Sequence, residues 1–258
     1  MTTATAADAA PVLRLRGLNM SFGGVHALSG IDIDVAQGER LVILGPNGAG
    51  KTTLFNVVAG DLRPTAGTVE IDGLNVEELP ARRRPQLGMS RTYQRSRLFA
   101  GLTVEENLYL AVLGKEGRRF RLRMGRRDAA YRDRARRAAA NVWLDGRLGT
   151  LTSDLSHGEQ RQLELGLATV TEPRVLMLDE PASGLSRGER ERLTELLLAL
   201  EREVTLLLID HDMDVALRVA ERVVVMHDGV KIVEGTPDEI RANPQVHDIY
   251  LGRGITHE

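Results

Sequence analysis

The chain of 258 residues carries a net charge of −2, with 42% hydrophobic and 27% charged residues, which is the composition of a soluble globular protein. This charge balance excludes a general attraction to nucleic acid or anionic membranes, and the absence of cysteine excludes disulfides and thiolate metal sites. The apolar runs, such as 206–209, are too short to span a bilayer. We therefore expect a soluble protein that reaches a membrane only through a partner.

The first part of the chain indicates a tail followed by an antiparallel sheet. Residues 1–11 are rich in Ala and Thr and lack a cationic start and an apolar core, so they predict a disordered tail and not a signal peptide. Apolar and polar residues alternate over 12–18 and 31–35, as in half-exposed strands. Phe22, in a Ser-Phe-Gly-Gly turn, is either a stacking platform for a nucleotide base or a core residue.

A phosphate-binding loop follows the apolar run Leu41–Leu44. Residues 45–53 have the pattern G-x-x-x-x-G-K-T, between an expected strand and an expected helix. Glycines let backbone amides turn toward a phosphate, and the helix dipole favours the same negative charge. In such a loop Lys51 reaches the β- and γ-phosphates and the Thr52 hydroxyl binds Mg²⁺. The pattern predicts a P-loop for ATP with Mg²⁺.

The middle of the chain, residues 91–155, has a different composition and is predicted to be a helical subdomain. Between Lys115 and Arg137 eleven basic residues accompany three acidic ones, and 127–142 has good helix propensity. A nucleic-acid or anionic-lipid patch and a solvated helix face both account for this segment, and the scarcity of aromatic residues favours the solvated face. Trp143 is expected to pack within the subdomain, which interrupts a core formed by 12–90 and 156–258.

The second half predicts a parallel sheet. Apolar runs at 175–178, 206–209 and 223–226 alternate with helical segments at 187–201 and 213–220, which gives a βαβαβ pattern. A turn at 227–229 leads into an edge hairpin with 230–233, and Pro237 opens a final helix. The fold class is therefore α/β, a P-loop NTPase core with a mainly parallel sheet, an N-terminal antiparallel piece and an inserted α-helical subdomain.

Two further motifs carry candidate chemistry. Asp179 and Glu180 follow the run 175–178, at the end of a strand where ligands bind in open α/β sheets. We expect Asp179 to hold Mg²⁺ and Glu180 to polarise the attacking water, although adjacent acids also cap loops. Ser156 is a natural helix N-cap, and Gly158 is expected to leave its amide accessible to an anion. Taken alone, this last stretch is better explained as an ordinary capped helix.

The order of these motifs around a helical segment resembles the ATP-binding subunit of ABC transporters, from about Val12 to Leu251. The resemblance implies that Phe22 stacks on adenine, that Ser156 and Gly158 contact the γ-phosphate held by another subunit, and that Glu180 is the base. It assigns nucleotide binding to Phe22, Val25, Asn47, Gly48, Ala49, Gly50, Lys51, Thr52, Thr53, Ser156 and Gly158. It assigns catalysis to Lys51, Gln94, Glu180 and His211, and Mg²⁺ binding to Thr52, Gln94 and Asp179.

The chain departs from the family pattern at three positions. His157 and Glu159 stand where the family has Gly and Gln, and Ser186 stands where many relatives carry Asp. These departures leave every group assigned to chemistry in place. They bear on communication between two nucleotide sites across a dimer.

Within the family, Arg91–Gln94, Leu102–Leu108 and the ending Tyr250–Gly252 are similar to the ATPases of branched-chain amino acid importers. Related ATPases import urea or short amides or extract lipopolysaccharide. The resemblance implies a homo- or heterodimer with a similar ATPase, transmembrane permease subunits, an extracytoplasmic solute-binding protein and no nucleic acid. It places the chain in the cytoplasm, on the inner face of the plasma membrane through the permease. A soluble non-transport ABC ATPase and a non-hydrolysing regulatory module stay as alternatives.

Overall fold

The computed structural model describes residues 10–92, 98–115 and 126–251. Its main sheet has six strands in the order β10-β9-β3-β8-β7-β6, and all neighbours pair in parallel except the edge hairpin of β9 and β10. The strands are β3 (Arg40–Leu44), β6 (Met89–Arg91), β7 (Val175–Asp179), β8 (Thr205–Ile209), β9 (Arg222–His227) and β10 (Val230–Gly235). Every residue of β3, β7 and β8 is buried, which explains their continuous apolar sequences. The predicted parallel sheet and edge hairpin are confirmed.

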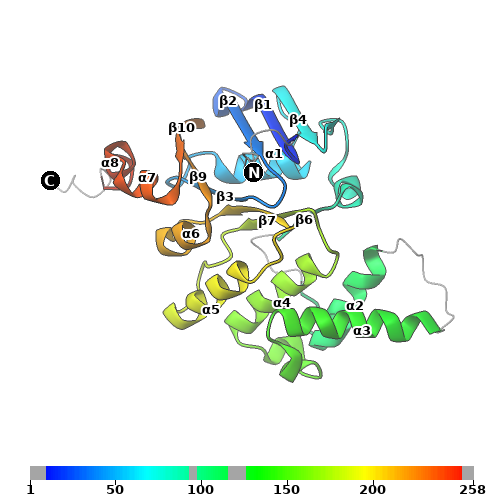
Figure 1. Ribbon diagram of the computed structural model, residues 1–258. Helices are drawn as coiled ribbons and strands as arrows, with labels where there is room; N and C mark the ends of the chain where they lie inside the picture. The colour runs from blue at the N-terminus through cyan, green and yellow to red at the C-terminus, as the bar shows by residue number, and fades with distance from the viewer. Residues whose placement is uncertain (1–9, 93–97, 116–125, 252–258) are drawn as a thin grey trace, which may run out of the picture.

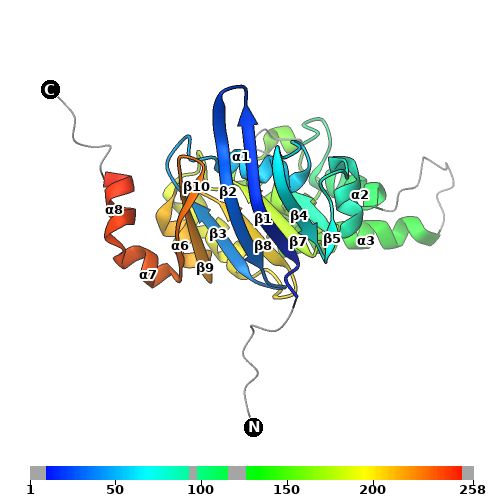
Figure 2. The same ribbon diagram turned by 90° about the horizontal axis from the view of Figure 1, so that it is seen from above.

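A second, antiparallel sheet has the order β2-β1-β4-β5. It is formed by β1 (Leu13–Phe22), β2 (Val25–Val35), β4 (Ala66–Ile71) and β5 (Leu74–Asn75). Burial alternates along β1 and β2, because one face packs on the core while the other meets solvent. Figures 1 and 2 show this sheet stacked over the main sheet, with α1 (Lys51–Ala59) between the two.

Helices cover the other face of the main sheet (Figure 1). These are α4 (His157–Thr169), α5 (Arg187–Leu198) and α6 (Met213–Val219), with α2 (Val104–Lys115) and α3 (Arg126–Asn141) packed on α4 at one end. Short 3₁₀ helices lie at 81–87, 145–147 and 152–154. On the opposite side of the molecule, α7 (Pro237–Ala242) and α8 (Pro244–Leu251) follow β10 (Figure 2).

The alternation of side chains along β3 creates two separate cores. Leu41 and Ile43 belong to the cluster that contains α1 and the antiparallel sheet. Val42 and Leu44 point to the opposite face and join the cluster that contains α4, α5 and α6. The helices α1 and α4 therefore lie on opposite faces of the main sheet, as successive residues of a strand require.

Two local expectations differ from the structure. Trp143 was expected inside the helical segment, but it is 39% exposed, and the Arg192 guanidinium of α5 lies 5.7 Å from its ring centroid. The helix expected to reach Glu201 ends at Leu198, where the buried Arg40 donates to the Leu198 carbonyl at 3.0 Å and so caps the helix end. In the ranges that the structure describes, no helix is long and apolar enough to cross a bilayer.

Candidate functional site

The loop of residues 45–50 joins β3 to α1 in a conformation that glycine adopts most easily. Gly45 and Gly50 have φ values of 152° and 93°, in a region that a Cβ disfavours. A Cβ would lie 2.2 Å from the Met226 carbonyl oxygen at Gly45 and 2.5 Å from the Ala27 carbonyl oxygen at Gly50. Glycine is therefore required at both positions, for the backbone conformation and for the close packing.

The first turn of α1 has no capping side chain. Gly50 is the N-cap residue, and no acidic residue stands in the first turn. The Leu54 amide donates to the Gly50 carbonyl at 2.9 Å, so the amides of Lys51, Thr52 and Thr53 precede the first bond of the helix. They lie at the positive end of the helix dipole, where a phosphate group fits.

Lys51 is buried within the electrostatic reach of three carboxyl groups. It is 5% exposed, and its ammonium donates to two carbonyls of the loop, of which that of Gly45 is at 2.7 Å. Burial lowers the pKa of Lys51, whereas the charges of Glu180, Asp179 and Asp210 act to raise it. The structure thus brings the predicted Lys51, Asp179 and Glu180 together at the carboxyl ends of the central strands.

Asp179, the last residue of β7, has one satisfied and one unsatisfied oxygen. Arg91 donates to its Oδ2 at 3.0 Å, while its Oδ1 is buried and makes no hydrogen bond within the described part of the chain. Burial raises the pKa of Asp179, and Arg91 opposes this. A buried carboxylate oxygen without a partner is costly unless a cation completes it, so Asp179 fits the predicted Mg²⁺ ligand.

The residues around Asp179 do not form a complete metal site by themselves. The described ranges contain no group of three or more acidic, His or Cys side chains that would hold a metal ion. Thr52, predicted to share the ion, is exposed at the start of α1, and Gln94 lies outside the described residues. A Mg²⁺ ion here would take its other ligands from phosphate oxygens and water, as is usual for this ion.

Arg91, the last residue of β6, was not assigned a role from the sequence. Its side chain is 7% exposed and bonds Asp61 at 3.0 Å as well as Asp179, and its guanidinium lies 5.8 Å from the Phe55 ring centroid. The parallel pairing of β6 with β7 carries Arg91 next to Asp179. The sequence offered only a basic residue at one strand end and an acid at another, with no sign that the strands are neighbours.

Glu180 and His211, which the resemblance assigns to catalysis, lie close to each other. Glu180 has a φ of 49°, a left-handed conformation that is strained for a residue with a Cβ. Its amide donates to the Ile209 carbonyl at 2.8 Å, which ties it to the end of β8. The His211 Nδ1 lies 3.8 Å from a Glu180 carboxylate oxygen, and His211 is about half exposed.

Asp210 supports the position of His211 and was missed from the sequence. It is fully buried, and its carboxylate accepts the Ala182 amide at 3.2 Å and the Asp212 amide at 2.9 Å. Burial raises the pKa of Asp210. The carboxylate thereby joins the loop after Glu180 to the loop that carries His211.

Phe22 and Val25 face solvent at the hairpin between β1 and β2. They are 47% and 68% exposed and lie opposite each other in the strand pairing. The alternative that Phe22 is a core residue is therefore excluded. Ala27, two residues after Val25, contacts the loop at Gly50, so the exposed aromatic ring projects from a hairpin that borders the phosphate loop.

The start of α4 is capped from within the chain. The Ser156 hydroxyl accepts the Glu159 amide, and the Glu159 carboxylate accepts the Ser156 amide, which makes a capping box. The Gly158 amide donates to the Glu189 carboxylate at 3.0 Å. The expectation that this amide is accessible is therefore wrong for the single chain. Ser156 and Gly158 begin α4, which packs on the face of the main sheet opposite the phosphate loop and α1.

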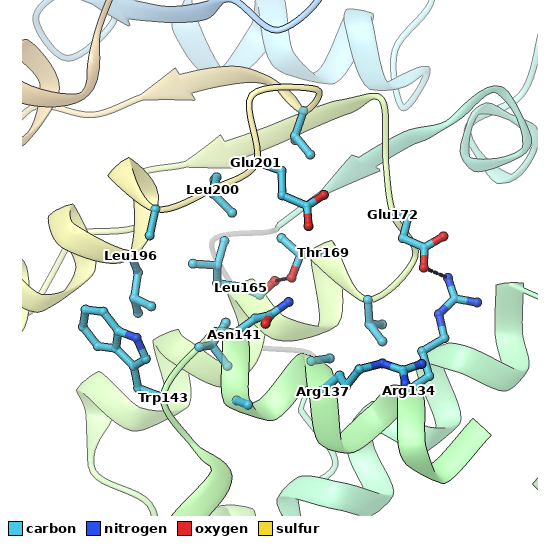
Figure 3. Close-up of a pocket in the computed structure, with 16 residues that line it drawn as sticks. Arg134, Arg137, Asn141, Trp143, Leu165, Thr169, Glu172, Leu196, Leu200 and Glu201 are labelled. Atoms are coloured by element: carbon cyan, nitrogen blue, oxygen red, sulfur yellow. Dashed lines mark hydrogen bonds and ion pairs between the residues drawn. The ribbon is translucent and has the colours of Figure 1, made fainter. Parts of the chain in front are cut away.

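A cavity of about 700 Å³ lies between α3, α4 and the end of α5, away from these motifs. Figure 3 shows Trp143 and Leu196 on one side of it and the ion pair of Arg134 with Glu172 on the other. None of the residues that line it was assigned to nucleotide binding. The candidate site is defined by the phosphate loop and the strand-end acids, and this cavity belongs to the packing of the helices.

The order of the motifs and the geometry around Lys51 agree with a family comparison. Residues 28–183 match the model described as ABC transporter. The chain belongs to the ABC transporter family. It is 38% identical to the high-affinity branched-chain amino acid transport ATP-binding proteins LivG of Salmonella typhimurium and BraF of Pseudomonas aeruginosa, over 94% of this chain and 98% of each relative. Residues 230–255 match a second model, described as branched-chain amino acid ATP-binding cassette transporter.

Solved ABC cassettes share the fold. The crystal structure of one cassette in its ADP conformation has a TM-score of 0.82 and 26% identity, covering 95% of this chain and 100% of that one. A dimeric cassette in a post-hydrolysis state, bound to ADP and phosphate, has a TM-score of 0.74 and 25% identity, covering 87% and 98%. The predicted family and α/β fold are confirmed, and this ABC protein is a nucleotide-binding ATPase.

Proposed function

We propose that this ATPase powers the uptake of branched-chain or related amino acids through a membrane permease. The observation that carries the proposal is the match of residues 230–255 to the branched-chain amino acid cassette model. The phosphate loop and strand-end acids are shared by ATPases of every cargo, whereas the C-terminal segment distinguishes this group. The 38% identity to LivG and BraF over nearly their whole length supports the same assignment.

Two such subunits are proposed to form a head-to-tail pair around ATP. The phosphate loop and the start of α4 lie on opposite faces of the main sheet in one chain, so a nucleotide on Lys51 does not lie against Ser156 of the same chain. In the pair, Ser156 and Gly158 of one subunit contact the γ-phosphate that the other subunit holds. The dimeric solved cassette, bound to ADP and phosphate, supports the pairing of two ATPase subunits. The partner is a second copy or a similar ATPase.

Each residue of the site is proposed to have a distinct part in hydrolysis. Glu180 orients a water molecule and accepts its proton as the water oxygen bonds to the γ-phosphorus and the bond to the leaving ADP oxygen breaks. Lys51 stabilises the charge on the transferring group, and His211 holds the γ-phosphate. Asp179, Thr52 and Gln94 would hold Mg²⁺, which when bound neutralises charge on the phosphate oxygens.

The nucleotide base is proposed to lie on the exposed Phe22 ring, next to Val25, while the amides of residues 47–53 surround the phosphates. The helical segment 91–155 and Gln94 are proposed to contact the permease, which would hold the chain at the cytoplasmic face of the membrane. An extracytoplasmic solute-binding protein completes the proposed importer.

The arginines of α3 whose side chains the structure describes give no support to a nucleic-acid partner. Arg132, Arg136 and Arg137 each form an ion pair, with Asp128, Glu105 and Asp133 respectively. Basic side chains that are already paired on one protein surface make a poor site for phosphates. This favours the solvated helix face over a nucleic-acid patch.

Purification from the native cells tests the partners. The tagged chain is isolated from gently solubilised membranes, and the co-purifying proteins are identified by mass spectrometry. Two polytopic membrane proteins with a similar ATPase are expected. Recovery with ribosomes or nucleic acid, or without membrane proteins, would support a soluble non-transport ATPase and contradict the proposal.

Uptake measurements test the cargo. Cells in which Lys51→Ala replaces the native residue should lose uptake of labelled leucine, isoleucine or valine, and the wild-type chain should restore it. Loss of urea or short-amide uptake with normal amino acid uptake would assign the chain to an amide importer. A defect confined to lipopolysaccharide export would assign it to an extractor.

A further inference from the structure

The Glu189 carboxylate joins the first turns of two helices. Its Oε2 accepts the amide and the hydroxyl of Ser186, the N-cap residue of α5, at 2.9 Å and 2.7 Å. Its Oε1 accepts the Gly158 amide in the first turn of α4 at 3.0 Å. A Cβ at position 158 would lie 2.5 Å from Oε1, so the contact depends on glycine there.

The Glu189 carboxylate is an anion, which is the kind of group that the amides at the start of α4 attract. Hydrogen bonds from Ser186 lower the pKa of Glu189, and the Gly158 amide adds to this, so Glu189 is an anion at neutral pH. A cavity of about 250 Å³ adjoins the contact; its lining includes Arg192, and also Arg147 and Arg161, which form ion pairs with Glu159 and Glu164. The amides of the helix start favour an anion at this point, and in the single chain that anion is Glu189.

Two of the three departures from the family pattern lie at or next to this contact. Ser186 provides the N-cap that fixes Glu189. His157 packs over the loop after Glu180, because its Cε1 lies 3.1 Å from where a Cβ would stand at Gly184. These departures from the family sequence thus lie where α4 meets the loop between β7 and α5.

We propose that Glu189 competes with ATP on the partner subunit for the Gly158 amide and keeps the start of α4 occupied until the two subunits meet. The proposal rests on the head-to-tail pairing proposed above. The γ-phosphate carries more charge than one carboxylate and displaces Oε1, while Oε2 keeps its bonds to Ser186. Glu189 thereby raises the ATP concentration that pairing requires.

The first experiment measures pairing in a Glu180→Gln background, which slows hydrolysis. Sedimentation velocity is recorded while ATP and Mg²⁺ are titrated. Glu189→Gln should lower the ATP concentration at half-pairing about tenfold, because a charge-assisted bond is replaced by a weaker neutral one. Glutamine retains the capping role at this helix position, so α5 should remain folded.

Glu239→Gln is the matched control. Glu239 forms the same capping box with Thr236 at the start of α7. This variant removes the same charge from the same position of another helix, and its half-pairing concentration should equal that of the Glu180→Gln parent. Equal values for Glu189→Gln and Glu239→Gln would overturn the competition.

The second experiment needs only the single chain, with inorganic phosphate as the probe. The Gly158 amide resonance of Glu189→Gln should shift at lower phosphate concentration than that of the wild type. Identical phosphate responses would overturn the proposal. Glu189→Gln could respond at a lower phosphate concentration although the protein does not pair when ATP is added. That result would support the role of Glu189 at the Gly158 amide and contradict the head-to-tail pair.

Discussion

The starts of α1 and α4 are two helix ends predicted to bind phosphate, and they are built differently. The start of α1 follows Gly50, which has no capping side chain, and carries no acid in its first turn. The start of α4 is capped by Ser156 and Glu159, and its Gly158 amide is taken by Glu189. One end is prepared for phosphate in the single chain, whereas the other is satisfied by the protein itself.

This difference shows what marks a ligand site at a helix end. The starts of α5 and α7, where no ligand is predicted, carry capping boxes of the same kind as α4. Free amides and a positive dipole are common to all helix starts, so they do not identify a ligand site. The α1 start differs because glycine replaces the capping side chain and a buried lysine follows it.

Lys51→Ala removes the buried lysine at the start of α1. It should have the largest effect on ATP hydrolysis. ATP hydrolysis should fall to background, because no other described cation lies among the loop carbonyls and strand-end acids to stabilise the transferring phosphoryl group. Steady-state phosphate release checks this. Lys115→Ala, at the exposed end of α2, is the control and should retain full activity. Substantial turnover by Lys51→Ala would contradict its assignment.

Glu180→Gln should slow hydrolysis by roughly 10²–10⁴-fold if Glu180 is the general base, while ATP binding is retained. Single-turnover experiments measure the rate of hydrolysis, and equilibrium binding experiments measure the affinity for ATP. Glu172→Gln is the matched control, since Glu172 is also a left-handed glutamate, with a φ of 49°, but pairs with surface cations. A similar loss of rate in both variants would point to backbone strain and not to proton transfer.

Gly50→Ala should damage the uncapped start of α1 itself. The substitution adds left-handed strain of about 1–3 kcal/mol and a clash with the Ala27 carbonyl, so both nucleotide affinity and stability should fall. Gly73→Ala has a similar φ of 74° with nothing within 4 Å of the added Cβ. Calorimetric nucleotide binding and urea unfolding should therefore show a loss of affinity for Gly50→Ala alone.

Ser156→Ala should weaken the capped start of α4 by about 1 kcal/mol, the usual effect of removing an N-cap side chain. Ser186→Ala should have a similar effect on α5, because its capping box is the same. Urea unfolding at neutral pH measures both. An unchanged free energy of unfolding in Ser156→Ala would mean that its hydroxyl is not needed for the helix.

The stability that a capping box contributes should also change slightly as the pH falls. Hydrogen bonds from Thr236 lower the pKa of Glu239 below its ordinary value of 4.5. A carboxyl whose pKa is lower in the folded state contributes its full stability above pH 4.5, and this contribution is lost as pH falls through the folded pKa. The difference in Tm between wild type and Glu239→Gln should therefore be greatest at neutral pH and disappear in acid. A difference that is constant with pH would exclude a contribution from the charge.

The sequence predicted the elements that local patterns specify. The strands β3, β7 and β8, the loop of residues 45–50 and the Ser156 N-cap all follow from apolar runs, glycines and capping residues within a few positions. It also predicted that Lys51, Asp179 and Glu180 lie at one edge of the main sheet, because the carboxyl ends of parallel strands meet there. The boundaries of the helical segment and the role of each site residue stay predictions.

Contacts between distant parts of the chain could not be predicted in this way. Arg91 reaches Asp179 only because β6 pairs with β7, and Glu189 reaches Gly158 only because α5 packs against α4. The left-handed backbone of Glu180 could not be predicted either, because it is fixed by a hydrogen bond from the Glu180 amide to the end of β8.

By itself, the sequence determined the local elements and from them predicted where a phosphate would bind and which acids would face it, because glycine content, capping and strand alternation act over a few residues. Only the tertiary structure decided that the start of α1 is open and the start of α4 is occupied. The Gly158 amide of α4 is bonded by Glu189, which comes from another helix, and the packing of whole helix faces onto the sheet places that side chain.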